Sequence, residues 1–544
     1  MNLYEVDLLV IGAGISGLRA AWQGVKNNYK TAIAYIGEGA SPGILAFNVP
    51  KTSDSSNDNC QVYYDDIISS GRYLNNHKLA KNLSLLSIEL TNSLKEIGYQ
   101  PEKDEKGNYL RRHLGGCSYP RSLFSGDSTG KDIMLALWSA LREKNVIEIE
   151  NVKILMPIMK ERRLIGAIGI HLQTKELIYI KAKNTVLASG GLGRLYKGST
   201  YPSDVSGSSA MFALLAGAKI TDMEFIQFEP TVCFTHPSID KMEIPTAMFG
   251  DGAYLKNKTG NRFMLSYGFK NEAGIEKSFM AKCINKEIKE GRGSRNGGVY
   301  FDARHLPKDI LEKYSLRVNR LKEAGYDLSK DLVEVRPAAH SHMGGVVIDE
   351  NCYSGVPGLF IAGEAAGGVH GASRIAGNSG SDVLVFGDRA GYFASKDIAN
   401  NKINYTRELW DEAVHLAQNR MQGILIKSMD PQIDITDETS ALLASYCGIE
   451  REGKLLDFAL GKLYKLKKNT TEIHSPSIDE IEIGLDNFRS ILLTEAILMA
   501  AFLRQESRGP HVRLDYPNER EFFEKNISHS LAENNFLQYY ISKH

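Results

Sequence analysis

The chain has 544 residues, too many for a single hydrophobic core, so two or three domains are expected. Its 65 basic and 65 acidic residues balance to a net charge of zero, without the basic excess that a nucleic-acid backbone requires. There is no run of about 18 apolar residues and no N-terminal signal segment. We therefore expect a cytoplasmic protein that neither binds nucleic acid nor inserts directly into a membrane.

The first strand leads directly into a glycine-rich turn. Residues 6–17 read VDLLVIGAGISG, with the GxGxxG spacing at the start of a helix expected over 18–26. In such a turn the first glycine permits a tight bend, the second lets a pyrophosphate approach the backbone, and the third packs helix against strand. This pattern predicts a dinucleotide site. The residues expected to contact the dinucleotide are Gly12, Ala13, Gly14, Ser16 and Gly17.

The second strand is expected over 31–36, and no acid stands at its end. Glu38 lies slightly later and is the candidate for the acid that binds a ribose hydroxyl. The alternation of strands and helices up to about residue 235 is typical of a doubly wound α/β domain. Within it, 147–186 reads as a β-meander, and Asp127 or Ser128 is expected to cap the helix that follows.

Two further glycine-rich segments are expected to bind the same ligand. Residues 189–193 (SGGLG) follow a predicted strand, and residues 358–391 place a strand, a glycine-dense loop and a helix in succession. Such loops let backbone N–H groups approach a ligand closely, and a helix N-terminus favours an anionic or electron-rich group. The candidate ligand contacts in these segments are Ser189, Gly190, Gly191, Glu364, Asn378 and Ser379.

The six cysteines are scattered and form no CxxC pair. Iron–sulfur clusters and structural zinc need clustered thiolates, so no metal site is expected in this chain, and its thiols should be reduced. Any iron–sulfur centre that exchanges electrons with the protein would then belong to another chain.

Six motifs in order carry a family resemblance: VIGAGISG, TVLASGGLGRLY, DMEFIQFEPT, HSHMGG, GLFIAGEAAGGVHGASRIAGNS and ESRGPHVRLDYP. Together they resemble the flavoprotein subunits of succinate dehydrogenase and fumarate reductase, and L-aspartate oxidase, over about residues 5–520. The resemblance implies FAD and hydride transfer between the flavin and a carboxylate-bearing substrate. It also implies noncovalent FAD, because residues 41–50 (SPGILAFNVP) lack the histidine to which respiratory members attach the flavin.

The expected fold class is α/β, with a Rossmann-like FAD-binding domain, an inserted α+β capping domain and a C-terminal helical domain. We expect the FAD-binding domain over 1–235 and 346–400, and the capping domain over 236–345. The motifs EFIQFEPT and HSHMGG that border the insert should lie at the active site. The helical domain is expected over 401–520 and a peripheral tail over 521–544.

The resemblance places substrate-binding roles on two residues. Arg374 stands where the family has an arginine that grips a substrate carboxylate, a task suited to a planar guanidinium fork. His340 stands where the family has a histidine that binds the substrate's other carboxylate end. His342 is an extra imidazole that is either a second proton-transfer candidate or a satisfied core residue.

Three positions depart from the family pattern. Glu229 replaces the histidine of QFHPT, and Pro245–Thr246 replace a Thr–Glu pair that helps to bind dicarboxylates. Lys277 aligns with the arginine that the family uses as proton donor. It either donates the proton, pairs with Glu229, or lies on the surface. Glu229 beside a substrate carboxylate would be unfavourable, so the substrate's far end should be neutral or cationic.

Three functions follow from the resemblance and its departures. The first is a flavin oxidoreductase like fumarate reductase, acting on a CH–CH bond next to a carboxylate, with an iron–sulfur subunit as its candidate partner. The second is an amino-acid-oxidising flavoenzyme like L-aspartate oxidase. The third is a non-catalytic FAD-binding subunit whose active site has decayed.

Overall fold

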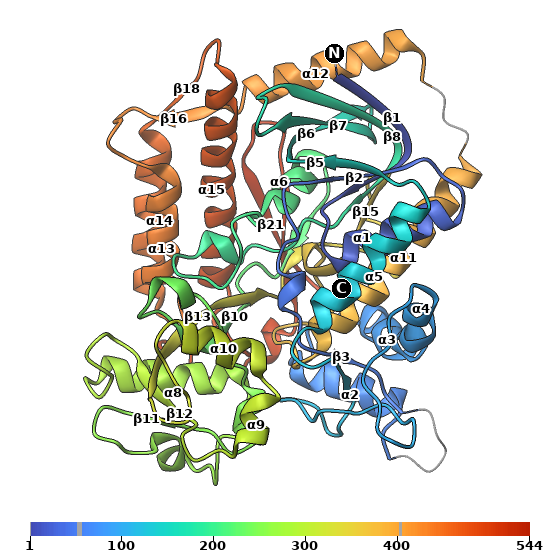
Figure 1. The fold of residues 1–544 in the computed structure, drawn as a ribbon. Coiled ribbons are helices and arrows are strands. Elements are labelled where there is room, and N and C mark those ends of the chain that lie inside the picture. Colours follow the sequence, from blue (N-terminus) through green and yellow to red (C-terminus); the bar gives the residue numbers. More distant parts are fainter. Residues whose placement is uncertain (1, 52–56, 402–404, 544) are drawn as a thin grey trace.

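The computed structural model describes residues 2–51, 57–401 and 405–543 (Figure 1). Part of the loop that leads to the second helix, and the start of the helical section expected from residue 401, lie outside the described residues. Three parts are visible: an α/β part that contains the N-terminus, a second part built around α8–α10, and a group of helices formed by α13–α15. The mixed α/β fold class is confirmed.

A seven-stranded sheet in the order β5-β2-β1-β8-β7-β6, with β15 also paired to β8, forms the centre of the first part. Strands β5, β2, β1, β8 and β15 are parallel neighbours, whereas β6, β7 and β8 form the antiparallel meander predicted from the sequence. The strands are β1 (Asn2–Ile11), β2 (Thr31–Tyr35), β5 (Ile147–Glu150), β6 (Val152–Lys160), β7 (Arg163–His171), β8 (Leu177–Leu187) and β15 (Leu359–Ile361).

Helix α1 (Ile15–Lys26) packs against α11 (Asn378–Asn400) and α5 (Thr129–Glu143). Two glycines of α11 allow α1 to approach closely, because a Cβ atom on Gly387 would lie 2.6 Å from the Ser16 carbonyl oxygen. A Cβ atom on Gly391 would likewise lie 2.4 Å from the Ala20 oxygen. The remaining elements of this part are β3 (Phe47–Asn48), α2 (Cys60–Ser70), α3 (His77–Leu86), α4 (Leu90–Glu96), β4 (Ser122–Leu123) and α6 (Ser208–Leu215).

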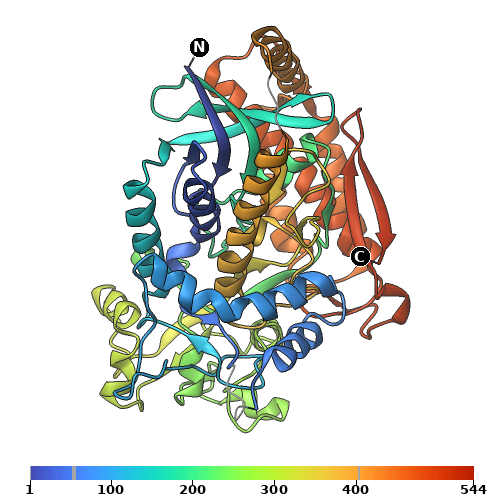
Figure 2. The same ribbon diagram turned by 90° about the vertical axis from the view of Figure 1, so that its right-hand side faces the viewer.

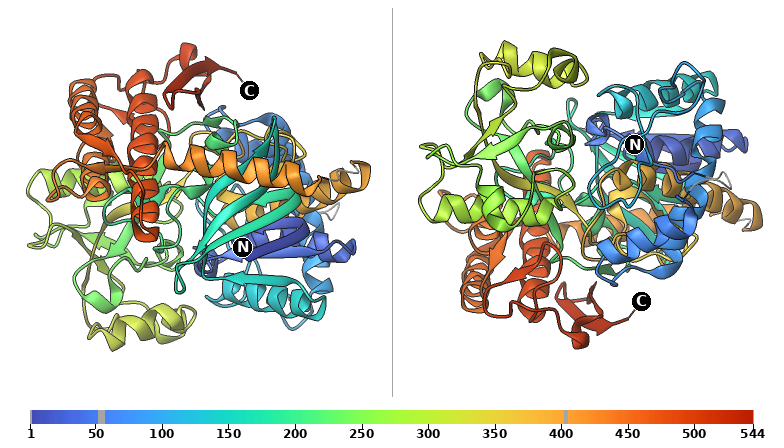
Figure 3. Two further views of the ribbon diagram at one scale, coloured as in Figure 1. Left: turned by 90° about the horizontal axis from the view of Figure 1, so that it is seen from above. Right: turned by 90° about the horizontal axis from the view of Figure 1, so that it is seen from below.

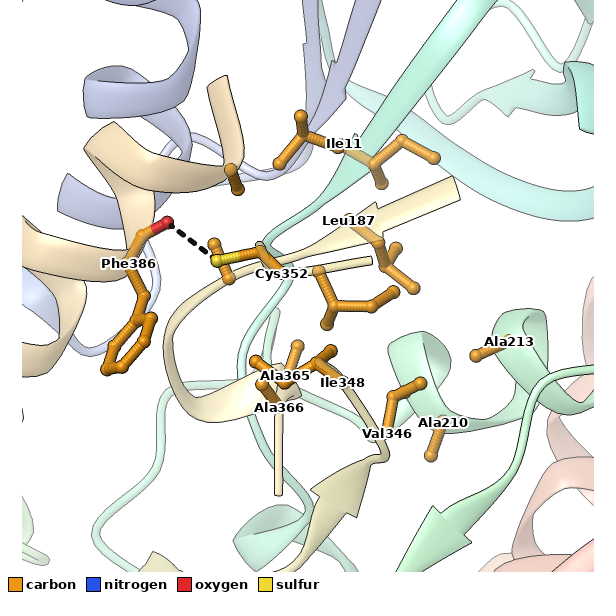
Figure 4. Packing of buried hydrophobic residues seen from close by; sticks show 14 of the residues in the cluster. Ile11, Leu187, Ala210, Ala213, Val346, Ile348, Cys352, Ala365, Ala366 and Phe386 are labelled. Carbon is orange, nitrogen blue, oxygen red and sulfur yellow. Dashed lines mark hydrogen bonds between the residues drawn. The ribbon is translucent and has the colours of Figure 1, made fainter. Parts of the chain in front are cut away.

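The main hydrophobic core lies where the ends of these strands meet α6 and α11. Figure 4 shows Ile11 of β1 and Leu187 of β8 near Cys352, whose Sγ lies 3.8 Å from the Phe386 carbonyl oxygen. Cys352 is fully buried, and burial raises the pKa of its thiol. All six cysteines are free, and only Cys60 is not buried.

The second part has its own four-stranded antiparallel sheet in the order β10-β13-β12-β11 and its own hydrophobic core. Its strands are β10 (Ile226–Cys233), β11 (Tyr254–Lys256), β12 (Val299–Asp302) and β13 (Val333–His342). Its helices are α7 (Ala247–Gly250), α8 (Lys277–Lys289), α9 (Lys308–Glu312) and α10 (Ser315–Glu323). We call this part the cap. Its first strand begins ten residues before the border expected at 236, because β10 pairs with β13.

The C-terminal helices are α12 (Arg407–Gln422), α13 (Ile435–Tyr446), α14 (Gly453–Lys468) and α15 (Ile478–Leu503). Helix α12 lies across the meander strand β6, as the left view of Figure 3 shows, while α13 and α14 pack on α15. Short strand pairs connect them: β16 (Ile426–Ser428) with β18 (Thr470–Glu472), and β17 (Glu450–Arg451) with β19 (Val512–Arg513).

The segment expected as a peripheral tail forms a β-hairpin of β20 (Asn526–Leu531) and β21 (Leu537–Ser542), red in Figure 2. Strand β20 pairs with β9 (Ile220–Thr221), which also pairs with β14 (Gly345–Val346). Ile527 is fully buried, and the Asn526 side-chain amide donates to Asp222 at 2.8 Å. The hairpin is therefore anchored to the body of the protein. Among the described residues, no helix is both long and apolar enough to cross a membrane.

Candidate active site

A cavity of about 650 Å³ extends from the glycine-rich turn after β1 to the underside of the cap. Gly12, Ala13 and Gly14 line it at the β1–α1 turn. Residues of the cap and of the long glycine-rich loop line its other part, including Glu229, Lys277, His340 and Arg374. The tertiary structure thus joins the predicted dinucleotide turn and the predicted substrate residues in one space.

The turn between β1 and α1 tolerates only glycine at two positions. Gly12 has a φ of +109°, and a Cβ atom there would lie 2.5 Å from the Ala188 carbonyl oxygen. A Cβ atom on Gly17 would lie 1.9 Å from the Gly12 oxygen. The first and third glycines therefore hold the turn, as the sequence pattern predicts.

Buried hydroxyls in the cavity wall fit a large polar cofactor. The Oγ atoms of Ser16 and Ser189 are buried and have no hydrogen-bond partner among the described residues, and both serines line the cavity. A buried polar atom without a partner costs about 1–3 kcal/mol, which a ligand's phosphate or ring heteroatoms would relieve. Both serines are predicted cofactor contacts, and Gly190 and Ser379 also line the cavity.

Four predicted cofactor residues do not line the cavity: Glu38, Gly17, Gly191 and Asn378. Glu38 is exposed. The Asn378 side-chain oxygen accepts hydrogen bonds from the Tyr63 hydroxyl and the Asn48 amide, both at 2.7 Å, so this side chain holds the start of α11. Gly17 and Gly191 serve close packing instead, since a Cβ on Gly191 would meet the Glu364 side chain at 2.8 Å.

Sequence reasoning missed several polar residues in the cavity wall. Asp204 accepts a hydrogen bond from the Gly39 backbone N–H at 2.8 Å, and the Ser41 hydroxyl accepts one from the Ile15 N–H at 2.9 Å, at the start of α1. His370 lies 3.3 Å from Asp382 through its Nε2 atom. All four line the cavity. Of these, His370 and Asp382 lie inside the glycine-rich stretch that the sequence marks.

Glu364 and His342 are both anchored by neighbouring protein groups. The Glu364 carboxylate accepts hydrogen bonds from the Tyr201 hydroxyl and, at 2.9 Å, from the His342 backbone N–H, and burial raises its pKa. The His342 ring nitrogens lie 3.0 Å from the Gly344 oxygen and 3.1 Å from the Met223 oxygen. Both nitrogens are thus engaged by the backbone, which favours the core-residue alternative for His342.

Arg374 is a buried cation that contacts neutral groups. Its guanidinium donates to the Ser341 hydroxyl at 3.3 Å, the Gln227 side-chain oxygen at 3.2 Å and the Ile375 carbonyl at 3.3 Å. Only 7% of the residue is exposed, and burial lowers its pKa. Within the part of the chain that the structure describes, no carboxylate forms an ion pair with it.

Lys277, the first residue of α8, forms an ion pair with Glu229 of β10. The lysine side chain is 18% exposed and the glutamate side chain 1% exposed, so the surface alternative for Lys277 is wrong. Burial raises the pKa of Glu229, and Lys277 opposes that shift. The second carboxylate oxygen of Glu229, Oε1, is buried without a partner among the described residues.

His340 lies between two carboxylates. Its Nε2 atom is 3.7 Å from Glu229 and its Nδ1 atom is 3.7 Å from Glu243, while the Thr200 hydroxyl lies 3.0 Å from Nδ1. Burial, and then the charges of Lys277 and Arg374, lower the pKa of His340 well below 6.5. The imidazole is therefore neutral at pH 7.

Glu243 is a further residue that the sequence did not single out, although Thr246, three positions later, was expected and does line the cavity. Glu229, Glu243 and His340 offer ligand atoms within 4.8 Å of one another, a spacing that a metal ion could use. The Lys277 ammonium already supplies a positive charge to Glu229. This arrangement favours the metal-free site expected from the sequence.

A contact with Asp127 docks the cap on the α/β part. Its carboxylate accepts a hydrogen bond from the Leu316 backbone N–H at 3.0 Å, in the first turn of α10, and the Arg317 side chain donates to the Asp127 carbonyl at 2.6 Å. The expectation that Asp127 or Ser128 caps α5 is wrong: Ser128 occupies the N-cap position of α5 but makes no capping bond.

Comparison with known proteins gives two family matches. A family model described as "FAD binding domain" matches residues 7–379, and one described as "Fumarate reductase flavoprotein C-term" matches residues 436–539. The chain belongs to the fumarate reductase family of FAD-dependent flavoproteins. The protein is an FAD-dependent oxidoreductase of the fumarate reductase, succinate dehydrogenase and L-aspartate oxidase type.

Relatives of this flavoprotein match it over nearly their whole length. It is 31% identical to a fumarate reductase (CoM/CoB) subunit of Methanothermobacter marburgensis, over 97% of each chain. It is 30% identical to L-aspartate oxidase of Acinetobacter baylyi, over 97% of this chain and 96% of the relative. A solved quinol-fumarate reductase with menaquinol molecules superposes with a TM-score of 0.89 at 25% identity, covering 100% of this chain and 98% of that chain.

Proposed function

We propose that this flavoprotein transfers hydride between FAD and a substrate that carries one carboxylate, bound by Arg374, and a far end that is not a carboxylate. The observation that carries the proposal is the contrast between two cations of the cavity. Arg374 is buried among neutral partners, whereas Lys277 is paired with Glu229. One cation is thus available for a substrate anion.

The Arg374 end suits a carboxylate. A guanidinium presents a planar fork of donors, and its pairing with a carboxylate is strongest where water is excluded. The Gln227 and Ser341 side chains hold the fork, each at 3.2–3.3 Å from a guanidinium nitrogen. A substrate carboxylate would relieve the cost of this buried charge.

The far end suits a neutral or cationic group. Glu229 and Glu243 both line the cavity on either side of His340, and a second substrate carboxylate there would meet two like charges. Succinate and fumarate are thereby disfavoured. An amino group would be attracted by the same two acids, and this favours amino-acid oxidation of the L-aspartate oxidase kind as the second candidate.

The chain's own residues would perform three tasks. Ser16, Ser189 and the Gly12 turn hold FAD, which we expect to be noncovalent and which supplies hydride chemistry when bound. Arg374 orients the substrate and stabilises negative charge that develops on its carboxylate side. Lys277 holds a proton at Nζ for the carbon that does not receive hydride, and Glu229 keeps that lysine charged.

Electron exchange with a second chain forms part of the proposal. The six free cysteines are not clustered, so this chain offers no thiolate set for an iron–sulfur centre within the described residues. The relative from Methanothermobacter marburgensis is itself named as one subunit of a fumarate reductase. We therefore propose a partner that carries iron–sulfur centres for the CH–CH chemistry, whereas amino-acid oxidation would use a soluble acceptor.

The test follows flavin absorbance without oxygen. Oxidised protein is mixed with succinate, L-aspartate and a panel of monocarboxylates with amide, alcohol or amine ends, and reduced protein with fumarate and unsaturated monocarboxylates. We expect a response from compounds with one carboxylate. Arg374→Gln should retain FAD and lower that response at least about 100-fold, the cost of leaving a buried charge pair incomplete. Arg320→Lys, at the cavity rim, is the matched control.

Two outcomes would reject the proposal. One is a flavin in Arg374→Gln that still responds within about threefold of the unmodified protein. The other is a faster response to succinate or fumarate than to every monocarboxylate, which would show that Glu229 and Glu243 accommodate a second carboxylate.

A further inference from the structure

Glu243, His340 and Glu229 form a row from the edge of the cap to the interior. His340 of β13 presents one ring nitrogen to each carboxylate, at 3.7 Å in both cases. Glu229 is buried and pairs with Lys277, whereas the Glu243 side chain is 20% exposed. The other oxygen of Glu243 lies 3.9 Å from Arg317 of α10.

A neutral imidazole between two carboxylates is suited to proton transfer. It carries one N–H and one lone pair, so it can accept a proton at Nδ1 while it releases another from Nε2. The distances of 3.7 Å exceed a hydrogen bond by about 1 Å, a gap that catalytic pairs often close when substrate binds. The Thr200 hydroxyl, 3.0 Å from Nδ1, restrains the ring in this orientation.

The Lys277–Glu229 pair needs such a supply. After Lys277 gives its Nζ proton to substrate, it is neutral and sits away from bulk water, with a side chain only 18% exposed. Within the described residues, the titratable groups that surround it in the cavity are Glu229, His340 and, beyond them, Glu243 and Arg374. Arg374 does not release its proton in proteins, so the row through His340 is the remaining route.

We propose that Glu243 and His340 form a proton relay that recharges the Lys277–Glu229 pair from solvent after each turnover. In the direction of substrate reduction, Glu243 takes a proton from water and passes it to His340 Nδ1. The His340 Nε2 proton moves to Glu229, and Glu229 passes one to Lys277 Nζ. Each step breaks one N–H or O–H bond and forms another, without electron transfer. The relay rests on the proposed function.

The first test separates one turnover from many. It uses Glu243→Gln, with Glu334→Gln of the same strand as His340 as the control, because Glu334 contacts Ser294 and Asn296 away from the cavity. The substrate is the fastest compound from the flavin assay. In Glu243→Gln we expect the first flavin reoxidation within about threefold of the unmodified protein and steady-state turnover about 10- to 100-fold slower, with a larger solvent deuterium effect.

Added formate should partly restore turnover in Glu243→Gln, because a small acid can deliver the proton that Glu243 no longer carries. Unchanged steady-state turnover in this variant would overturn the relay. Equal slowing of the first and later turnovers would also overturn it, since that pattern indicates a structural role.

The second test needs no substrate. Histidine labelled with ¹⁵N is observed by NMR, and the His340 signals are assigned by their loss in His340→Gln. We expect neutral-ring signals whose tautomer ratio changes in Glu243→Gln and not in Glu334→Gln. A permanently protonated ring, or a ratio indifferent to Glu243, would overturn the relay even if no carboxylate compound reacts and the proposed function fails.

A metal ion is the competing explanation for these three residues. The holoprotein is dialysed against Zn²⁺ and the bound metal is measured for the unmodified protein and for Glu243→Gln. We expect no stoichiometric zinc that depends on Glu243. One zinc per chain that is lost in Glu243→Gln would assign the cluster to a metal and overturn the relay.

Discussion

Lys277 and Glu229 form an ion pair between the first residue of α8 and the middle of β10. Each of these residues replaces the one expected from the family resemblance, an arginine and a histidine respectively. The two departures therefore contact each other and compensate in charge. A decayed site would have no reason to place an acid against a new lysine, so the contact favours a redirected active site.

The pair makes a prediction about stability. Lys277→Met leaves Glu229 as a buried, unpaired carboxylate, so it should lower the free energy of unfolding by about 3 kcal/mol or more. The double variant Glu229→Gln/Lys277→Met should lose less than the sum of the single variants, because neither charge is then stranded. Urea denaturation at pH 7.5 measures all four proteins. Strict additivity would contradict a direct pair.

His529 predicts a pH dependence of folding. Burial lowers the pKa of His529 to about 4, whereas an unfolded histidine has a pKa near about 6.5. The unfolded chain therefore binds more protons between these values, and stability falls as pH decreases from about 6.5 to about 4. This residue alone contributes about 1.4 kcal/mol per pH unit in that window.

The check compares urea denaturation at pH 7.5, 6.0 and 5.0. His529→Gln should lose less stability on acidification than the unmodified protein, although the substitution can lower stability at pH 7.5. His474→Gln, at an exposed position, is the control and should follow the unmodified protein. Parallel curves for the unmodified protein and His529→Gln would show that His529 does not carry the effect.

The contact between Asp127 and α10 predicts looser docking of the cap. Asp127→Ala removes the acceptor of the Leu316 N–H and should cost about 1–2 kcal/mol, as loss of a helix cap does. Limited proteolysis should then cut the cap faster. Ser128→Ala is the neighbouring control and should cost less, because the Ser128 side chain caps no helix N–H group. A greater effect of Ser128→Ala would restore the original expectation that Ser128 caps α5.

The hydroxyls of Ser16 and Ser189 predict a difference between the apo and FAD-bound protein. Each Ser→Ala change removes a buried oxygen that lacks a partner among the described residues. The apoprotein should therefore be as stable as before or more stable, while FAD affinity falls about 3- to 10-fold for each lost hydrogen bond. Calorimetric titration with FAD and thermal unfolding of the apoprotein measure the two effects. Unchanged affinity in both variants would place FAD elsewhere in the cavity.

Local patterns in the sequence were sufficient for much of the fold. The spacing of Gly12, Gly14 and Gly17 specifies a turn because backbone angles and close contacts act over a few residues. The meander over 147–186 followed from alternating apolar residues, and its turn at Glu161 has a φ of +53°. Asn378 shows the limit: its place in a helix start was correct, but its side chain bonds to Tyr63 and Asn48.

The sequence by itself determined the doubly wound sheet, the family, the cofactor class and the presence of Arg374 and His340 near a substrate. The tertiary structure alone decided that Lys277 pairs with Glu229, that the backbone engages both ring nitrogens of His342, and that Glu243 lies next to His340. The reason is physical. Turns and strands depend on neighbouring residues, whereas a charge's partner depends on how distant segments pack, and no local pattern encodes that distance.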